Sequence, residues 1–191
     1  MNIPKSAAFA ITLFFLSLSA NAIPITYIHT GSGSGSIDGT SFGTRDFVIT
    51  AFADTDDMRI NSLGNSIIDH LMASITITGV GTFDFITATR TFVVPGFQLV
   101  GFGFALGPDL FNGPEDVEFV GWDLVSSIGP IAGIGNLLQW DLGVLTDGGE
   151  LRFNDGSSAA TFQAVISEPG TLTLLSLGLL GLGLARRRNK A

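Results

Sequence analysis

Apolar segments close both ends of this 191-residue chain, and they confine the folded body to the residues between them. Near the N-terminus, Lys5 precedes an apolar run over residues 7–18, and Ala20 and Ala22 then supply the small residues of a cleavage site. This order is typical of a secretory signal peptide. We therefore predict a signal peptide over residues 1–22, cut by signal peptidase after Ala22. An uncleaved membrane anchor is the alternative, but the run is short for a span.

The C-terminal segment has three parts in a fixed order. An acidic turn comes first, an uncharged run over 171–185 follows, and a basic end closes the chain; the turn is Ser167-Glu168-Pro169-Gly170 and the basic residues are Arg186, Arg187, Arg188 and Lys190. A helix over 171–185 would rise about 22 Å, and snorkelling arginines would extend its reach across a membrane. The basic residues should remain in the cytoplasm. The alternative, a buried core helix, is disfavoured because the run has no polar face.

These three parts, in this order at the C-terminus, resemble the PEP-CTERM sorting signal of Gram-negative bacteria. The resemblance covers 167–191; Glu168 and Pro169 fit its second and third motif positions, while Ser167 replaces the first proline. It implies sorting by an exosortase, a membrane-embedded cysteine protease or transpeptidase-like enzyme, with cleavage near Glu168-Pro169. It also implies transient anchoring in the inner membrane with the body in the periplasm. Delivery to the cell surface or extracellular matrix would follow, in association with exopolysaccharide and biofilm.

The remaining body, residues 23–166, is strongly acidic. It holds every acidic residue except Glu168 but only four basic residues, all arginines, which gives a net charge of −12. Such a surface repels nucleic acid and anionic lipid, and it suits a soluble exported domain. The chain has no cysteine. Thiol nucleophiles, cysteine-ligated zinc and disulfides are therefore excluded.

Apolar and polar residues alternate with a period of two along much of the body. Phe47, Ile49, Ala51 and Ala53 share one parity, as do several shorter sets. Turn signals recur between them, including Asp38-Gly39, Pro95-Gly96 and Asn154-Asp155-Gly156. Together these patterns predict an all-β fold, an antiparallel β-sandwich of the jelly-roll type over residues 23–166. The body also resembles the variable β-rich domain that often precedes the PEP-CTERM signal.

Three stretches are harder to assign. Apolar residues at helical spacing predict a short helix over 66–72. Alternating glycine and serine over 31–36 fits a flexible linker or a thin edge strand. Val120, Trp122 and Leu124 alternate with polar residues or glycine, which predicts a further strand.

Recognisable catalytic patterns are missing from the sequence. There is no Gly-x-Ser-x-Gly elbow, no His-Glu-x-x-His motif and no phosphate-binding glycine loop. Two histidines, His29 and His70, are too few for the usual zinc site, and we expect each at the surface or hydrogen-bonded in the core. Carboxylates are numerous enough for a glycosidase pair, but no motif singles one out. We therefore predict that the protein is not an enzyme.

Acidic residues gather in two expected loops: Asp54, Asp56 and Asp57 in one, and Asn112, Glu115 and Asp116 in the other. Hard oxygen ligands on a loop suit Ca²⁺. Neither loop follows the spacing of an EF-hand, so solvated acidic turns are the expected role and calcium binding is the alternative. No other cofactor is predicted.

Aromatic residues offer a possible carbohydrate contact. Trp122, Trp140 and Tyr27 are candidates for stacking on sugar rings, and Asp141 beside Trp140 would add a hydrogen bond. Because aromatic side chains mostly bury, we expect both tryptophans in the core. The sequence thus predicts a non-catalytic surface or matrix protein, with a secreted carbohydrate-binding module, assisted by calcium, as the alternative.

Overall fold

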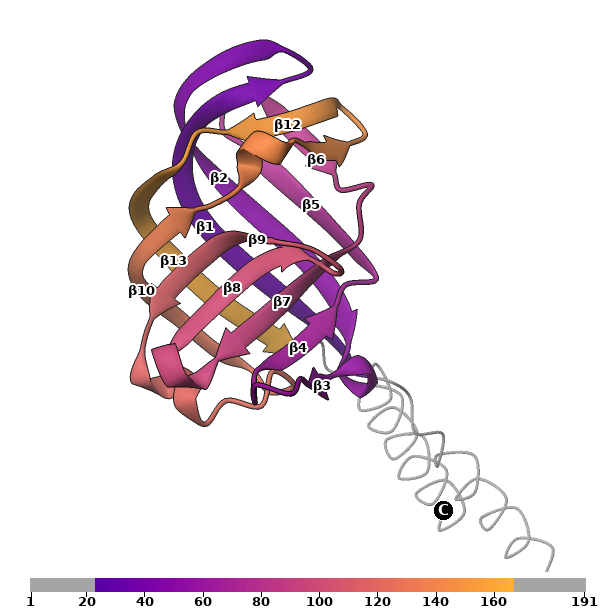
Figure 1. Ribbon diagram of the computed structural model, residues 1–191, viewed down its shortest axis with the longest axis vertical. Helices are drawn as coiled ribbons and strands as arrows, with labels where there is room; N and C mark the ends of the chain where they lie inside the picture. The colour runs from indigo at the N-terminus through magenta and orange to yellow at the C-terminus, as the bar shows by residue number, and fades with distance from the viewer. Residues whose placement is uncertain (1–22, 167–191) are drawn as a thin grey trace, which may run out of the picture.

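The computed structural model describes residues 23–166, which form an all-β body (Figure 1). Its strands are β1 (Pro24–Ile37), β2 (Thr40–Asp54), β3 (Arg59–Ile60), β4 (Ser66–Asp69), β5 (Met72–Ile77), β6 (Gly81–Asp84), β7 (Thr89–Val94), β8 (Leu99–Phe104), β9 (Asp109–Glu115), β10 (Ile128–Leu137), β11 (Val144–Thr146), β12 (Gly149–Phe153) and β13 (Gly156–Ile166). Short 3-10 helices join some of them: η1 (Thr55–Asp57), η2 (Pro95–Phe97), η3 (Val117–Val120) and η4 (Trp140–Leu142).

All these strands belong to one antiparallel sheet. Its order is β3-β4-β7-β8-β9-β10-β13-β1-β2-β5-β6; β12 pairs with β1 beyond the end of β13, and β11 pairs with β12. The sheet curls, so that β7, β8 and β9 lie in front of β1 and β13 (Figure 1). The all-β, antiparallel prediction is confirmed, but the two-sheet sandwich of the jelly-roll type is corrected to one curled sheet. The physical reason is the length of β1 and β2, 14 and 15 residues, which lets right-handed twist accumulate instead of splitting the sheet.

The concave side of the sheet holds the core. On β2, Phe47, Ile49, Ala51 and Ala53 are all buried, as their alternation predicts. The largest fully buried side chains are mainly aromatic: Trp140, Tyr27, Phe47, Phe102, Phe111, Phe119 and Phe162. Burying one such side chain is worth about 1.5–3 kcal/mol in transfer free energy. The abundant phenylalanines of the sequence therefore fill this interior.

Glycines of β1 allow unusually close packing. The stretch 31–36 is neither a linker nor an edge strand, because β1 pairs with β2 on one side and with β13 and β12 on the other. A Cβ on Gly31 would lie 2.7 Å from the Phe47 ring, and a Cβ on Gly33 would lie 2.5 Å from Leu137. A Cβ on Gly35 would collide with the Arg152 carbonyl oxygen. Glycine is needed here for close approach, not for flexibility.

The predicted helix over 66–72 is wrong, since this stretch contains β4, a bend and the start of β5. Ile67 lies beside Phe92 of β7 in the sheet, and Ile68 faces the core. Ile67 and Ile68 are adjacent in the sequence and both are buried, so the apolar residues of this stretch follow the spacing of a helix although the chain is extended.

The strand predicted around Trp122 is also wrong. Val120 ends η3, and Leu124 has a positive φ of 64°, which no strand accommodates. The indole N–H of Trp122 donates instead to the carbonyl of Ser126 at 2.9 Å, which closes a compact loop. Alternation here reflects a loop that packs its apolar residues against the core.

The ends of the described chain meet at one end of the body. Ile25 pairs with Ile166 there, while the opposite end of β1 leads to the Asp38-Gly39 turn. Both turn residues have positive φ, 46° and 77°, as a two-residue hairpin requires. The twelve steps from Ile25 to Ile37 span about 40 Å at strand rise. The signal peptide, the sorting motif, the uncharged run and the basic end fall outside the described residues. None of the helices within 23–166 combines the length and apolar character needed to cross a membrane.

Candidate functional site

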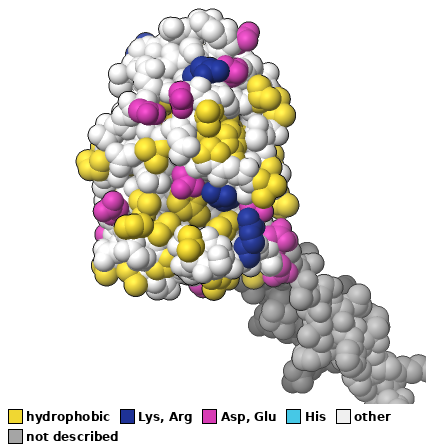
Figure 2. Space-filling model, viewed as in Figure 1, with side chains coloured by type: hydrophobic (Ala, Val, Ile, Leu, Met, Phe, Trp, Pro, Cys, Tyr) yellow, Lys and Arg dark blue, Asp and Glu magenta, His cyan; other side chains and the backbone are white. Residues whose placement is uncertain are grey.

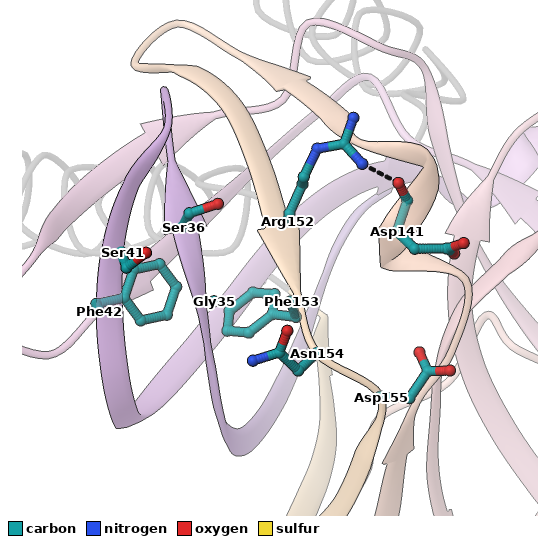
Figure 3. Close-up of a pocket in the computed structure, with 9 residues that line it drawn as sticks. All are labelled: Gly35, Ser36, Ser41, Phe42, Asp141, Arg152, Phe153, Asn154 and Asp155. Atoms are coloured by element: carbon teal, nitrogen blue, oxygen red, sulfur yellow. Dashed lines mark hydrogen bonds between the residues drawn. The ribbon is translucent and has the colours of Figure 1, made fainter.

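A surface cleft of about 530 Å³ opens between the β1–β2 hairpin and the chain from β12 into β13 (Figure 3). Gly35, Ser36, Ser41 and Phe42 line it from the hairpin. Asp141 of η4 lines the other side, together with Arg152 and Phe153 of β12 and the turn residues Asn154 and Asp155. Antiparallel pairing of β12 with β1, from Gly35 with Phe153 to Ile37 with Leu151, brings these distant segments together.

Two phenylalanines form the apolar part of this cleft. The ring of Phe42 meets that of Phe153 edge-to-face, with their centroids 5.6 Å apart. Phe153 is buried and continues into the core, where its ring lies 5.0 Å from that of Trp140. Phe42 is half-buried, so part of its ring remains available to a ligand.

The polar groups of the cleft differ in how firmly they are held. The Arg152 guanidinium donates to the Glu150 carboxylate at 2.5 Å and to the backbone carbonyl of Asp141 (dashed line in Figure 3). The Asn154 amide donates to the Ser34 hydroxyl at 3.0 Å. The carboxylates of Asp141 and Asp155, both exposed residues, receive no hydrogen bond from any residue in 23–166. These two carboxylates are free to accept hydrogen bonds from a ligand.

The aromatic residues considered for sugar stacking lie in the core. Tyr27 and Trp140 are fully buried, and Trp122 is 8% exposed. The Tyr27 hydroxyl donates to the Leu124 carbonyl and the Trp140 indole N–H to the Leu110 carbonyl, each at 2.6 Å. Burial, with a smaller contribution from Asp123, raises the pKa of Tyr27. The predicted core role of the tryptophans is confirmed, and stacking on these three residues is excluded by their burial.

The two histidines form a hydrogen-bonded network with two threonines of β7, in which His29 is fully buried and His70 is partly buried. His70 Nδ1 lies 2.8 Å from the Thr89 hydroxyl and its Nε2 lies 3.0 Å from the Thr91 hydroxyl. His29 Nε2 lies 3.3 Å from the same Thr91 hydroxyl. Burial lowers the pKa of each histidine to about 3, and the neighbouring His70 adds to this effect at His29. Both are therefore neutral at ordinary pH, and of the two placements expected from the sequence, surface or hydrogen-bonded, the structure has both side chains hydrogen-bonded.

Of the residues considered for calcium, Asp54 and Asp116 stand at the N-termini of short helices, and Asp56 and Asp57 lie within η1. Asn112 and Glu115 lie in β9, so their placement in a loop is corrected. Asp54 accepts a hydrogen bond from the backbone N–H of Asp56 at 2.9 Å and caps η1. Asp116 caps η3 in the same way, through the backbone N–H of Glu118. In residues 23–166, no three side chains of His, Asp or Glu stand together in a manner that could hold a metal ion. Local capping thus accounts for the carboxylates of Asp54 and Asp116.

A comparison with protein families identifies the C-terminal segment. The family model described as the PEP-CTERM protein-sorting motif matches residues 165–188. The chain carries a PEP-CTERM sorting motif. This confirms the resemblance drawn from the sequence, and it implies an exported protein that an exosortase sorts to the cell surface. Neither the curated proteins nor the solved structures contain a match to the chain.

The PEP-CTERM match begins inside the folded sheet. Val165 and Ile166 are its first residues and also the last residues of β13. The backbone N–H of Ile166 donates to the Ser127 hydroxyl at 3.0 Å, and Ile166 pairs with Ile25. The body is thus folded up to the residue before Ser167. The cleft is lined by Gly35 and Ser36 near the other end of β1, away from this point.

Proposed function

We propose that this chain is an exported, non-catalytic protein of the cell surface or extracellular matrix, sorted by an exosortase and associated with exopolysaccharide. The observation that carries the proposal is the PEP-CTERM match over 165–188. Export begins with the signal peptide over 1–22, and the uncharged run over 171–185 anchors the chain in the inner membrane until processing. The basic residues from Arg186 onward keep the tail in the cytoplasm.

Cleavage takes place near Glu168-Pro169. Proline lacks a backbone N–H and constrains the residue before it to an extended conformation, so it favours a strand-like peptide in a protease site. Because β13 ends at Ile166, the processing enzyme works immediately beside the folded body.

The composition of the interior supports a role without catalysis. His29 and His70 are enclosed by aromatic rings and bonded to threonines, so neither can take a proton from a substrate in the cleft. Only Arg152 brings a positive charge to the cleft, and Glu150 neutralises it. A turnover screen with purified protein on glycoside and ester substrates should therefore give no product, and any turnover that the purified protein sustains would refute this part.

Deletion of the exosortase in the native host tests the sorting proposal. The unprocessed form should accumulate in the inner membrane, and mass spectrometry should find an intact C-terminus at Ala191 instead of an end near Glu168. Pro169→Ala should reproduce this defect in a wild-type host, whereas Thr171→Ala, just beyond the motif, should not. Unchanged size and location after the deletion would refute exosortase sorting.

The cleft favours a second candidate function, a secreted carbohydrate-binding module. Its half-buried Phe42 and its free carboxylates are the type of groups that bind sugars. A glycan array probed with and without chelator tests both binding and calcium assistance. Loss of glycan binding in the presence of chelator would support calcium-assisted binding. If no glycan on the array were bound, this candidate function would be discarded.

A further inference from the structure

We propose that the cleft between the β1–β2 hairpin and the β12–β13 turn binds a neutral or amino-bearing saccharide and rejects acidic ones. The inference rests on the carbohydrate-binding candidate above and adds the location of the site, its charge selectivity and its orientation.

The size and the aromatic floor of the cleft suit a sugar ring. The cleft volume of about 530 Å³ falls within the range of small-molecule sites. Its floor is an aromatic pair in which Phe42 meets Phe153 edge-to-face, and the ring of Phe42 remains partly exposed. An aromatic ring supplies a flat apolar surface at low conformational cost, and it suits the apolar face of a pyranose.

Both walls of the cleft carry side chains that can form hydrogen bonds with a ligand. Asp141 and Asp155 lie on the same side of the cleft (Figure 3), and an ionised carboxylate can accept several hydrogen bonds at once. The hydroxyls of Ser36 and Ser41 can both donate and accept from the opposite wall. A ligand with neighbouring hydroxyl groups can form hydrogen bonds with both the carboxylates and the serine hydroxyls, since each ligand hydroxyl can donate and accept.

Charge decides which saccharide fits. Asp141 and Asp155 contribute two negative charges, and the single positive charge of Arg152 is already paired with Glu150 at 2.5 Å. The rest of the surface is acidic too; Figure 2 shows acidic side chains at several places on one face, with few basic ones. A uronate or a phosphorylated sugar would be repelled, whereas a protonated amino sugar would be attracted.

The cleft is also held in shape before any ligand arrives. The Asn154 N–H donates to the Ser34 carbonyl at 2.8 Å, and the Asn154 side chain donates to the Ser34 hydroxyl at 3.0 Å. These bonds tie the β12–β13 turn to β1, and the close approach at Gly35 ties β12 to the same strand. A preformed site loses less conformational entropy on binding.

The position of the cleft lets it work while the chain is tethered. Ile25 pairs with Ile166, the last residue that the structure describes. Ten steps along β1 lead from Ile25 to Gly35, a distance of about 33 Å at strand rise. The cleft therefore points away from the end that continues into the PEP-CTERM motif. A polymer outside the membrane can reach it before or after processing.

The test uses the processed protein purified from the native host and three oligosaccharide probes: cellohexaose as neutral, chitosan hexamer as amino-bearing and oligogalacturonate as acidic. Calorimetry at low salt should detect binding of a neutral or amino probe and none of the acidic probe. Phe42→Ala should weaken binding at least tenfold, and Asp155→Asn should weaken it about threefold to tenfold while leaving the unfolding transition unchanged.

Matched controls come from the other end of the body, where Phe97 is 72% exposed and Asp57 is exposed. Phe97→Ala and Asp57→Asn should bind as the wild type does. The inference would be overturned if none of the three probes bound or if the acidic probe bound best. Binding as tight as that of the wild type by Asp155→Asn and Phe42→Ala would also overturn it. The C-terminal mass of the same preparation reports sorting separately, so a correctly processed protein without binding refutes the site alone.

Discussion

The centre of the body and the cleft at its far end are built from the same kinds of side chain, aromatic rings beside polar groups. In the centre the rings of Tyr27 and Trp140 are fully buried, and the Tyr27 hydroxyl and the Trp140 indole each donate to a backbone carbonyl. In the cleft, Phe42 is only half-buried and the carboxylate of Asp155 accepts no hydrogen bond from residues 23–166. Exposure, and not residue type, therefore separates the groups that stabilise the fold from the groups available to a ligand.

One residue joins the two regions. Phe153 packs against Trp140 and Phe47 on its inner side, with centroids 5.0 Å and 5.3 Å away, and against Phe42 on its outer side. The floor of the cleft is therefore the edge of the core. Substitutions in the core should therefore also disturb the cleft, whereas substitutions at the cleft rim should leave the packing of the core unchanged.

Removal of Trp140 should have the largest effect. This indole is fully buried, and its N–H donates to the Leu110 carbonyl. Trp140→Ala leaves a cavity and removes one of the two hydrogen bonds that the Leu110 carbonyl accepts, the other coming from the Leu138 N–H. The free energy of unfolding should therefore fall by about 3–5 kcal/mol, mainly through the cavity. Urea unfolding measures the loss. Trp140→Phe retains a ring but has no donor, and its free energy of unfolding should fall by roughly 1–3 kcal/mol. A loss below about 3 kcal/mol for Trp140→Ala would show that the centre is loosely packed.

Acidification should destabilise the centre of the body through its two histidines. In the folded protein the pKa of His29 and His70 is about 3, whereas an unfolded histidine titrates near 6.5. As the pH falls from 6.5 towards 3, only the unfolded chain takes up these protons, so the free energy of unfolding falls by up to about 1.4 kcal/mol per pH unit for each histidine. Above pH 6.5 the histidines contribute no slope. Between pH 6.5 and 5.0 the pair should account for roughly 3 kcal/mol.

Urea unfolding at several pH values measures this slope, and a single His29→Gln variant supplies the comparison. The variant loses one buried histidine and should therefore show about half of the histidine contribution to the slope. An unchanged slope would mean that His29 is protonated in the folded body, contrary to its enclosure by Phe102, Phe111 and Phe162.

The strands of the centre could be predicted from sequence because burial there follows the pleat. Phe47, Ile49, Ala51 and Ala53 repeat every second residue, and β2 presents all four to the core. The pattern fails where adjacent residues are both buried, as at Ile67 and Ile68 of β4. One of them lies beside a neighbouring strand and the other faces the core, so a strand takes on the spacing of a helix.

The number of sheets and the cleft could not be predicted because both depend on pairing between distant segments. Gly35 of β1 lies opposite Phe153 of β12, and nothing in either local sequence specifies the other. The Asn154-Asp155-Gly156 turn was readable as a turn, but its neighbour Phe42 comes from a hairpin more than a hundred residues earlier. The PEP-CTERM motif could be read because its three parts are contiguous in the chain.

The junction between centre and cleft should respond to Gly35. A Cβ at this position would collide with the backbone carbonyl of Arg152, which cannot swing away as a side chain could. Gly35→Ala should therefore separate β12 from β1 and lower the free energy of unfolding by about 1–3 kcal/mol. Gly43→Ala is the matched control on β2, because nothing lies within 4 Å of its added Cβ. Equal stability of the two variants, measured by urea unfolding, would contradict the close approach of β12.

Asp155 should show the smallest effect on stability, and this makes it the sharpest test of the difference between the regions. Its exposed carboxylate makes no hydrogen bond within residues 23–166, so Asp155→Asn should change the free energy of unfolding by no more than about 0.5 kcal/mol. The substitution keeps the shape of the cleft but removes one negative charge, so the rejection of an acidic oligosaccharide should weaken. Equilibrium unfolding and calorimetry with oligogalacturonate on one preparation measure both quantities. A stability loss as large as that of Gly35→Ala would place Asp155 in the structural framework, and the distinction between a packed centre and an available rim would then fail at this residue.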